Sequence, residues 1–155
     1  MRRVNLERAE LSYDDDDPPG YAAAAVRLAG QLGTEELSIN LFEVPPGQSL
    51  CPYHYEYVEE WLLILDGTAT VRAPDGEVQL ERGDLVRFPA GPEGAHKVSN
   101  RGEAPVRFIM FSSSREPAVA VYPDSDKVGV WTGNEGDDWM FHRGGAKVPY
   151  YEGEI

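Results

Sequence analysis

Hydrophobic and polar residues alternate along residues 36–44 (ELSINLFEV), with the two-residue period of a β-strand. The alternation places Leu37, Ile39, Leu41 and Glu43 on one face and Ser38, Asn40, Phe42 and Val44 on the other. Residues 61–65 (WLLIL) and 106–112 (VRFIMFS) are apolar on both faces instead. We expect both faces of these two strands to be buried, one against an opposing sheet and one against the tail or a partner chain. This favours a homodimer.

Turn-forming sequences separate the short apolar segments between residues 45 and 105. They include PPG, DG, PDG, RGD and PAGPEG, where Gly, Pro and Asp suit the backbone conformations of tight turns. The intervening segments TATVRA, EVQLE, LVRF and AHKVSN are strand-like, and no helical period appears before residue 115. This rhythm predicts an all-β sandwich or barrel.

The two ends of the chain are less regular. Residues 14–20 (DDDDPPG) predict a solvated loop, because like charges repel and proline lacks a backbone donor. Residues 21–30 (YAAAAVRLAG) fit a short helix or a strand, since alanine favours helix while flanking glycines limit the length. Residues 118–131 predict one more strand followed by a loop, and 113–155 as a whole is expected to pack back on the barrel.

Composition and charge narrow the possible partners. The chain has 155 residues, 41% of them hydrophobic, which is enough for one globular domain with its own core. A net charge of −13 argues against nucleic acids and anionic membranes as partners. No apolar run approaches the roughly 18 residues of a bilayer span, and MRRVNLERAE lacks the apolar stretch of a secretory signal. Cys51 is the sole cysteine, which favours a cytoplasmic location.

The segment 51–61 (CPYHYEYVEEW) concentrates the groups that could carry chemistry. Read as a strand, it points His54, Glu56 and Glu60 to one side. The opposite side then holds the aromatic residues Tyr53, Tyr55, Tyr57 and Trp61, expected in packing or an interface. Leu62 would share the side of Glu60, so the acids would face an apolar interior. Buried acids are costly unless they are paired or bind a cation, so the segment is either a bland surface strand or part of a metal site.

Neighbours of these residues have less support. Glu59 has the opposite parity and is expected at the surface, although a bend could exchange its role with that of Glu60. Cys51 also has the wrong parity for the site and is expected to be structural. His96, about forty residues further on, is a possible positive or metal-binding partner that spacing alone links only weakly.

Two stretches, taken together and in order, resemble the paired signature motifs of the cupins. The first is G47-QSLCPY-H54-Y-E56-YVE-E60-WLLILD-G67, and the second is G83-DLVRF-P89-A-G91-PEGA-H96-KVS-N100. The resemblance covers about residues 45–112 and implies a jelly-roll barrel, the double-stranded β-helix. It implies one domain over 1–155, with N-terminal strands in 1–44 and a C-terminal extension from 113 to 155.

The resemblance also implies a divalent metal ion inside the barrel, bound by His54, Glu56, Glu60 and His96. Glu56 departs from the motif, which has a second histidine at that position. Two histidines and two carboxylates form a harder, more oxygen-rich ligand set that favours Mn, Fe(II), Zn or Ni over Cu(I). Glu56 is therefore either a ligand that tunes the metal, a residue behind the ligands, or a change that weakens the site.

Three functions stay open at the level of sequence. The first is a small-molecule metalloenzyme, of dioxygenase or isomerase type, with metal positions left for substrate. The second is a non-catalytic domain that binds a sugar or an organic acid. The third is a structural or storage protein with a vestigial site. The fold supports all three, and no glycine-rich dinucleotide-binding loop is present in the sequence.

Five further residues are secondary candidates. Asn40 and Gln79 could line a pocket, because strands that form a barrel present some polar side chains to its interior. Arg87 and Arg107 could bind an anionic substrate or pair with surface acids. His142, in WMFHRGG, could be an extra ligand or a general acid, but no motif spacing supports it.

Overall fold

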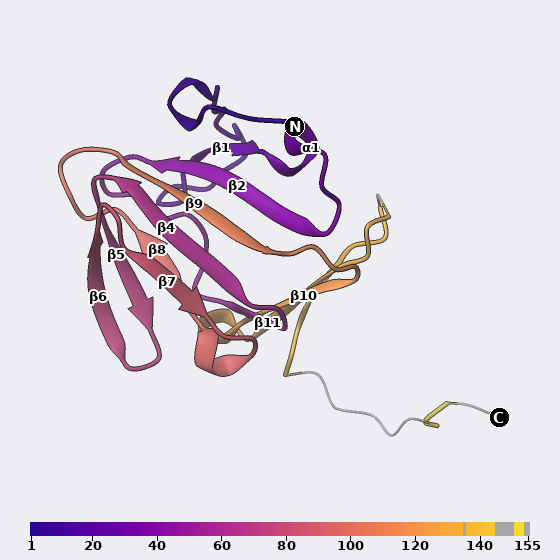
Figure 1. Cartoon of the computed structure of the whole chain (residues 1–155). Helices are drawn as coiled ribbons and strands as arrows, with labels where there is room; N and C mark the ends of the chain where they lie inside the picture. The colour runs from indigo at the N-terminus through magenta and orange to yellow at the C-terminus, as the bar shows by residue number, and fades with distance from the viewer. Residues whose placement is uncertain (135, 145–150, 154–155) are drawn as a thin grey trace.

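The computed structural model describes residues 1–134, 136–144 and 151–153 and consists mainly of antiparallel strands in two layers (Figure 1). The first layer is a five-stranded sheet with the order β1-β2-β9-β4-β7. Its strands are β1 (Ala24–Arg27), β2 (Leu37–Val44), β9 (Val106–Ser113), β4 (Glu60–Asp66) and β7 (Leu85–Phe88).

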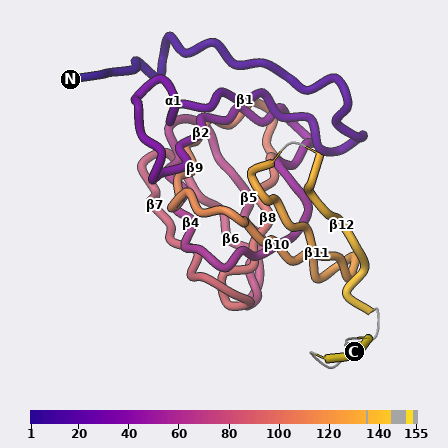
Figure 2. The backbone as a smooth tube through the Cα atoms, turned by 90° about the vertical axis from the view of Figure 1, so that its right-hand side faces the viewer, coloured from indigo at the N-terminus to yellow at the C-terminus, as the bar shows by residue number. Residues whose placement is uncertain are grey.

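The second layer is built from two smaller sheets with the orders β6-β5-β8 and β12-β11-β10-β3. Its strands are β6 (Gly76–Glu81), β5 (Thr68–Ala73), β8 (Lys97–Ser99), β12 (Trp139–His142), β11 (Lys127–Trp131), β10 (Ala118–Tyr122) and β3 (Tyr55–Glu56). A single β-bridge between His54, next to β3, and His96, next to β8, links the two sheets, and a second bridge joins Ser49 of the preceding loop to Ser99 in β8. In the view turned by 90°, β7 and β9 lie on the left of the molecule and the tail strands β10, β11 and β12 lie on the right (Figure 2).

Short helical turns connect the strands. They are η1 (Leu6–Arg8), α1 (Ala29–Leu32), η2 (Pro92–Gly94) and η3 (Pro123–Ser125). Residues 21–30 therefore contain both expected alternatives in succession, strand β1 and then the single turn α1. Gly33 ends α1 in the left-handed conformation, as glycine often does at this position.

The apolar core fills one half of the barrel. It comprises buried side chains of both layers, namely Val44, Leu62, Ile64, Ala69, Val71, Leu80, Phe88, Val98, Val106, Phe108 and Met110. Leu62 and Ile64 in β4 alternate with half-buried residues on the outer face of the same strand. The other half of the interior is left for the polar residues described below.

The observed fold confirms the all-β jelly roll expected from the sequence, and residues 14–20 form an exposed loop with turns. The prediction for the tail was wrong, because residues 118–131 form a hairpin of two strands and Trp139–His142 adds a third. Across the turn at Pro123–Ser125, Val119 pairs with Val130 and Val121 pairs with Val128, a pairing that the sequence pattern did not predict. Part of the expected extension, 145–150 and 154–155, lies outside the described residues. None of the helices among the described residues is long and apolar enough to cross a membrane.

Candidate metal centre

Two histidines face each other where the sheets of the second layer meet. The backbone of His54 pairs with that of His96, with N–H···O distances of 3.1 and 2.8 Å. Directly paired residues of antiparallel strands point their side chains to the same face. Accordingly, the two imidazole rings lie 4.8 Å apart between centroids.

Hydrogen bonds to backbone carbonyls fix which ring nitrogen of each histidine carries the proton. Nδ1 of His54 lies 3.0 Å from the carbonyl oxygen of Pro52, and Nδ1 of His96 lies 2.9 Å from that of Gly94. A carbonyl oxygen can only accept, so each Nδ1 donates. The lone pair of each neutral ring is then on Nε2, the nitrogen that points away from the backbone and into the barrel.

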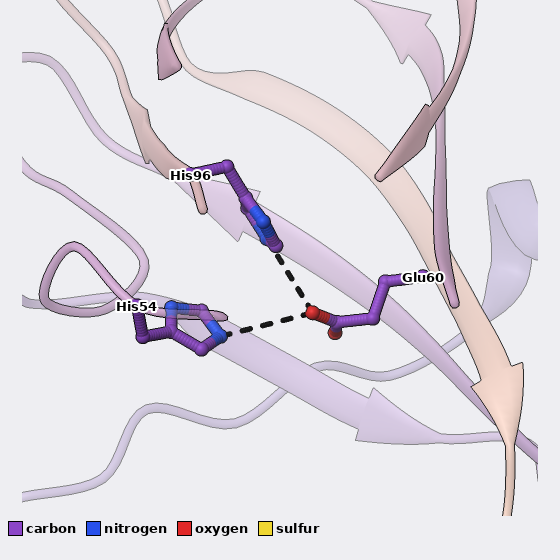
Figure 3. Close-up of side chains that lie close together, drawn as sticks. All are labelled: His54, Glu60 and His96. Atoms are coloured by element: carbon purple, nitrogen blue, oxygen red, sulfur yellow. Dashed lines mark ion pairs between the residues drawn. The ribbon is translucent and has the colours of Figure 1, made fainter. Parts of the chain in front are cut away.

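Glu60 completes the cluster from the opposite layer. It is the first residue of β4, and its Oε2 lies 3.8 Å from Nε2 of His54 and 3.7 Å from Nε2 of His96 (Figure 3). The three potential ligand atoms all lie within 4.8 Å of one another. His96 is fully buried, and its Nε2 has no hydrogen-bond partner. A buried acceptor without a partner is costly unless a hydrogen-bond donor or a cation binds it.

Aromatic side chains hold both imidazole rings in place. The ring of Phe88 stacks on that of His96 at 3.7 Å and 9°, and Tyr122 from β10 stacks on His54 at 5.9 Å and 27°. The close, flat contact with Phe88 restricts rotation of the His96 ring about its side-chain bonds. A ring that is already held in place lowers the entropic cost of binding a ligand.

The electrostatics of the cluster favour a cation. Burial, reinforced by the charge of Glu56, raises the pKa of Glu60 to about 8, while burial and the charge of His54 lower the pKa of His96 to about 4. Burial also lowers the pKa of His54. At neutral pH, both rings are thus neutral and Glu60 retains its proton unless a positive ion is present. A divalent cation at the centre would displace that proton and satisfy all three groups.

Glu56 lies in the same cavity but outside this cluster. It is half-buried in β3, and burial raises the pKa of its carboxyl group. The structure thus brings together three of the four candidate ligands, His54, Glu60 and His96, and places the fourth on the adjoining wall.

Cys51 lies at the cavity, whereas the sequence pattern placed it away from the site. Its Sγ lies 3.5 Å from Nδ1 of His54, and the residue lines the cavity. Burial and the nearby carboxylates of Glu60 and Glu56 raise the pKa of its thiol to about 12, so the group is a neutral thiol. The parity argument failed because the residues before His54 form bends and isolated bridges, and side chains do not alternate there as in a strand.

The aromatic residues of the same segment take three different positions. Tyr53 and Tyr55 are buried within the chain in a small cluster with Ala95 and Val121, which is the packing role expected for them rather than an interface. Tyr57 is 61% exposed, while Trp61 is half-buried and stacks on Phe111. The tail strand β10, which the sequence did not place, provides the cover for the two buried tyrosines.

Of the five secondary candidates, Asn40 lies at the cavity and the other four lie outside it. Asn40 lines the cavity, whereas Gln79 is exposed on β6 and outside it. Arg87 pairs with Glu59 at the surface (2.8 Å), which confirms the exposed position expected for Glu59. Arg107 donates a hydrogen bond to the carbonyl oxygen of Leu6 (3.0 Å) and lies close to the carboxylate of Glu43. His142 is exposed at the end of β12 and outside both cluster and cavity.

The cluster opens onto a cavity of about 950 Å³ between the layers. One wall is the inner face of β2 and β9, with Ser38, Asn40 and Ser112, and the tail strands contribute Val119 and Trp131. A cavity of this size accommodates a small organic molecule. Sequence reasoning missed these serines, because they became candidates only when strand pairing placed them beside Glu60.

Comparisons with known proteins agree with this architecture. Residues 40–112 match the family model of the cupin domain. A curated relative, the tetracenomycin polyketide synthase protein TcmJ of Streptomyces glaucescens, is 26% identical over 98 residues, which are 63% of this chain and 64% of TcmJ. The match therefore spans slightly less than two thirds of that relative's length.

Two crystal structures share the fold over nearly the whole chain. One, from Acidithiobacillus ferrooxidans, is described as a candidate sugar phosphate isomerase. It is 22% identical with a TM-score of 0.82, covering 93% of this chain and 92% of its own. The other is a sugar phosphate isomerase of the cupin superfamily from Silicibacter pomeroyi. It is 22% identical with a TM-score of 0.79, covering 96% and 97%. At this identity, the likeness shows the fold alone.

Proposed function

This chain contains a cupin domain at residues 40–112, and we propose that it is a small-molecule metalloenzyme that binds one divalent cation with His54, Glu60 and His96. The observation that carries the proposal is the convergence of three lone-pair donors that have at most one proton to share. They are the Nε2 atoms of two buried histidines and a carboxylate oxygen of the partly buried Glu60. Hydrogen bonding among these groups alone leaves Nε2 of His96 unsatisfied.

The residues fit a metal ion in chemistry as well as position. Histidine nitrogen and carboxylate oxygen together suit Mn, Fe(II), Zn or Ni. We propose Glu56 as a fourth ligand, because its half-buried carboxylate lines the same cavity and its charge contributes to the raised pKa of Glu60. When bound, such an ion supplies Lewis-acid or redox chemistry to a substrate in the cavity. The chain's own part is to fix the histidine tautomers through Pro52 and Gly94 and to exclude bulk water with Phe88 and Tyr122.

Isomerisation of a hydroxy-carbonyl compound is the first reaction to test, with dioxygenation second. Both are open to a centre with three or four protein ligands, which leaves coordination positions for substrate. Two proteins that share the fold are described as known or candidate sugar phosphate isomerases, which guides the choice of assay. Non-catalytic binding of a sugar or an organic acid is the alternative that a metal-loaded but inactive protein would favour.

Metal content of the purified protein tests the proposal. Protein prepared without chelators and measured by mass spectrometry of the metals is expected to contain close to one equivalent. His96→Ala should lose most of the metal, whereas His142→Ala, a change at an exposed histidine outside the cavity, should retain it. A wild-type protein that stays metal-free after incubation with Mn, Fe(II), Zn and Ni would refute the proposal.

Three broader proposals accompany this function. We propose a single domain over residues 1–155, because β10 of the tail pairs with β3 beside the candidate site. We propose a homodimer, because the edge strand β12 exposes Trp139, Met140 and Phe141. A cytoplasmic location is proposed from the single, unpaired cysteine.

A further inference from the structure

Strand register defines a row of polar side chains that leads away from the metal cluster. Glu60 in β4 pairs with Ser112 in β9, which in turn pairs with Ser38 in β2. Paired residues in antiparallel strands share a face, so both serines point into the barrel beside Glu60. All three residues line the cavity.

The neighbouring row of paired residues on the same face contains a positive charge, that of Arg27. Asn40 in β2 pairs with Arg27 in the edge strand β1, on the same inner face. Both residues also line the cavity. Neighbouring strands lie about 4.8 Å apart, so three strand spacings, roughly 14 Å, separate the backbone of β4 from that of β1.

Ser112, Ser38, Asn40 and Arg27 together form a polar track along the inner face of the sheet. Ser38 and Asn40 in this track have hydrogen-bonding groups available to a ligand. The side-chain amide of Asn40 donates to Oγ of Ser38 at 3.0 Å. This leaves the Ser38 hydroxyl proton and the Asn40 carbonyl oxygen available to a ligand. Alternating donors and acceptors along a wall suit the vicinal hydroxyl groups of a polyol.

Arg27, exposed at the end of β1, is one of two arginines among the described residues that line the cavity. In a chain of net charge −13, five arginines pair with carboxylates: Arg72, Arg87, Arg101, Arg107 and Arg143. Within the part of the chain that the structure describes, no ion pair or hydrogen bond engages the guanidinium of Arg27, and the same holds for Arg115, which also lines the cavity. Acids line the wall as well, but Glu116 and Asp138 both belong to the tail, and Asp138 accepts a hydrogen bond from the backbone of Thr132.

We infer that the cavity binds an anionic, polyhydroxylated compound. Its hydroxyl or carbonyl end lies at His54, Glu60 and His96, its chain lies along Ser112, Ser38 and Asn40, and its phosphate or carboxylate group pairs with Arg27. The inference rests on the proposed function, because the metal cluster defines one end of the track. A guanidinium pairs strongly and bidentately with either anion.

Calorimetric titration with four probes tests the inference: D-ribose 5-phosphate, D-ribonate, D-ribose and inorganic phosphate. At least one of the two anionic polyols is expected to bind ten-fold or more tightly than D-ribose, and the one that does identifies the anion. D-ribose 5-phosphate should also bind more tightly than inorganic phosphate, which lacks the polyol. If neither anionic polyol exceeds D-ribose in affinity, the inference is overturned. If inorganic phosphate equals D-ribose 5-phosphate, the part assigned to the polyol is overturned.

Matched arginine variants locate the anion. Arg27→Gln should reduce the preference for the anionic polyol at least ten-fold, while Arg82→Gln, at an exposed arginine outside the cavity, should leave it unchanged. A preference retained in Arg27→Gln overturns the assignment. Metal content measured on the same preparations separates this inference from the proposed function. Bound metal without anion preference refutes only the inference. An Arg27-dependent preference in protein that stays metal-free after incubation with Mn, Fe(II), Zn and Ni refutes only the metal proposal.

Discussion

Hydrogen bonds to the backbone set the orientation and the protonated nitrogen of the two buried histidines. His54 and His96 each donate a proton from Nδ1 to a carbonyl within the same short loop, Pro52 and Gly94 respectively. The local backbone thereby selects the tautomer, and the lone pairs converge on Glu60. Fixing a tautomer through a neighbouring carbonyl is the usual way in which proteins orient metal-binding histidines.

The raised pKa of Glu60 predicts a pH-dependent stability of the metal-free protein. The unfolded chain releases this proton near 4.5 and the folded protein near 8, so folding takes up a proton between these values and rising pH favours unfolding. Between about pH 4 and pH 6.5, the lowered pKa of His96 has the opposite effect, because the unfolded chain then binds a proton that the folded protein does not, and rising pH favours folding. After treatment with a chelator, the melting temperature should therefore fall between pH 6.5 and 8.

Substitution of Glu60 isolates this effect. Glu60→Gln should abolish the fall in melting temperature, because no proton is then released in the buried site. Glu59→Gln, a change at the exposed neighbour paired with Arg87, should preserve it. Equal pH profiles for the wild type and Glu60→Gln, measured by scanning calorimetry, would show that Glu60 ionises normally.

Asn100 acts on structure rather than chemistry. Its buried amide donates to the carbonyl oxygens of Val44 (2.7 Å) and Ala104 (2.8 Å) and accepts from the backbone of Gly102 (2.9 Å). Asn100→Ala leaves the buried carbonyl of Val44 and two part-buried backbone groups without partners. It should destabilise the fold by about 3 kcal/mol, measured by urea denaturation. Asn134→Ala, in an exposed turn, is the comparison and should change stability by less than about 0.5 kcal/mol. A small effect at Asn100 would mean that water replaces the amide.

At the scale of elements, two glycines of the first motif hold turns in the left-handed region for different reasons. Gly67, between β4 and β5, has φ of 77°. Gly47, in the loop between β2 and β3, has φ of 78°. A Cβ at Gly67 would lie 2.8 Å from the carbonyl oxygen of Pro105, while one at Gly47 would meet nothing within 4 Å. The φ angles of the two glycines match, so the difference between them is the close approach of the Pro105 carbonyl oxygen to Gly67.

Alanine substitutions should separate these two costs. Gly47→Ala is expected to cost about 1 kcal/mol, the ordinary penalty for a side chain at positive φ. Gly67→Ala should cost at least about 2 kcal/mol more, because the strand end that carries Pro105 must move. Chemical denaturation of both variants under one condition provides the measurement. Equal losses would indicate that the turn at Gly67 relaxes freely.

At the scale of the whole molecule, the tail completes the barrel and leaves one apolar edge. Strand β10 covers Tyr53 and Tyr55 with Val121, and Tyr122 of the same strand stacks on His54. Strand β12 is the outer strand of the four-stranded sheet, and Trp139, Met140 and Phe141 are 60%, 53% and 49% exposed. An exposed apolar edge strand readily pairs with another chain.

We therefore expect a dimer in sedimentation experiments, with β12 at the contact. The double change Trp139→Glu and Phe141→Glu should shift the protein to monomer, because like charges then face each other across the edge. Leu85→Glu, at the edge strand β7 where Leu85 is 55% exposed, should leave the dimer intact. A wild-type monomer would contradict the dimer, and a monomer produced only by Leu85→Glu would place the contact on the other edge.

The sequence determined the strand pattern and the candidate ligands that motif spacing could name, because period-two alternation, turn residues and the order of residue types are properties of local chain segments. It therefore predicted β2, β4, β9 and the barrel, and it named His54, Glu56, Glu60 and His96 as candidate ligands. The tertiary structure decided what depends on pairing between distant segments. It placed Cys51 against His54, covered two tyrosines with β10, separated Glu56 from the three-residue cluster and aligned Ser38, Ser112 and Arg27 with Glu60. Alternation specifies faces only inside regular strands, and register between strands is fixed by packing and turn geometry over the whole barrel.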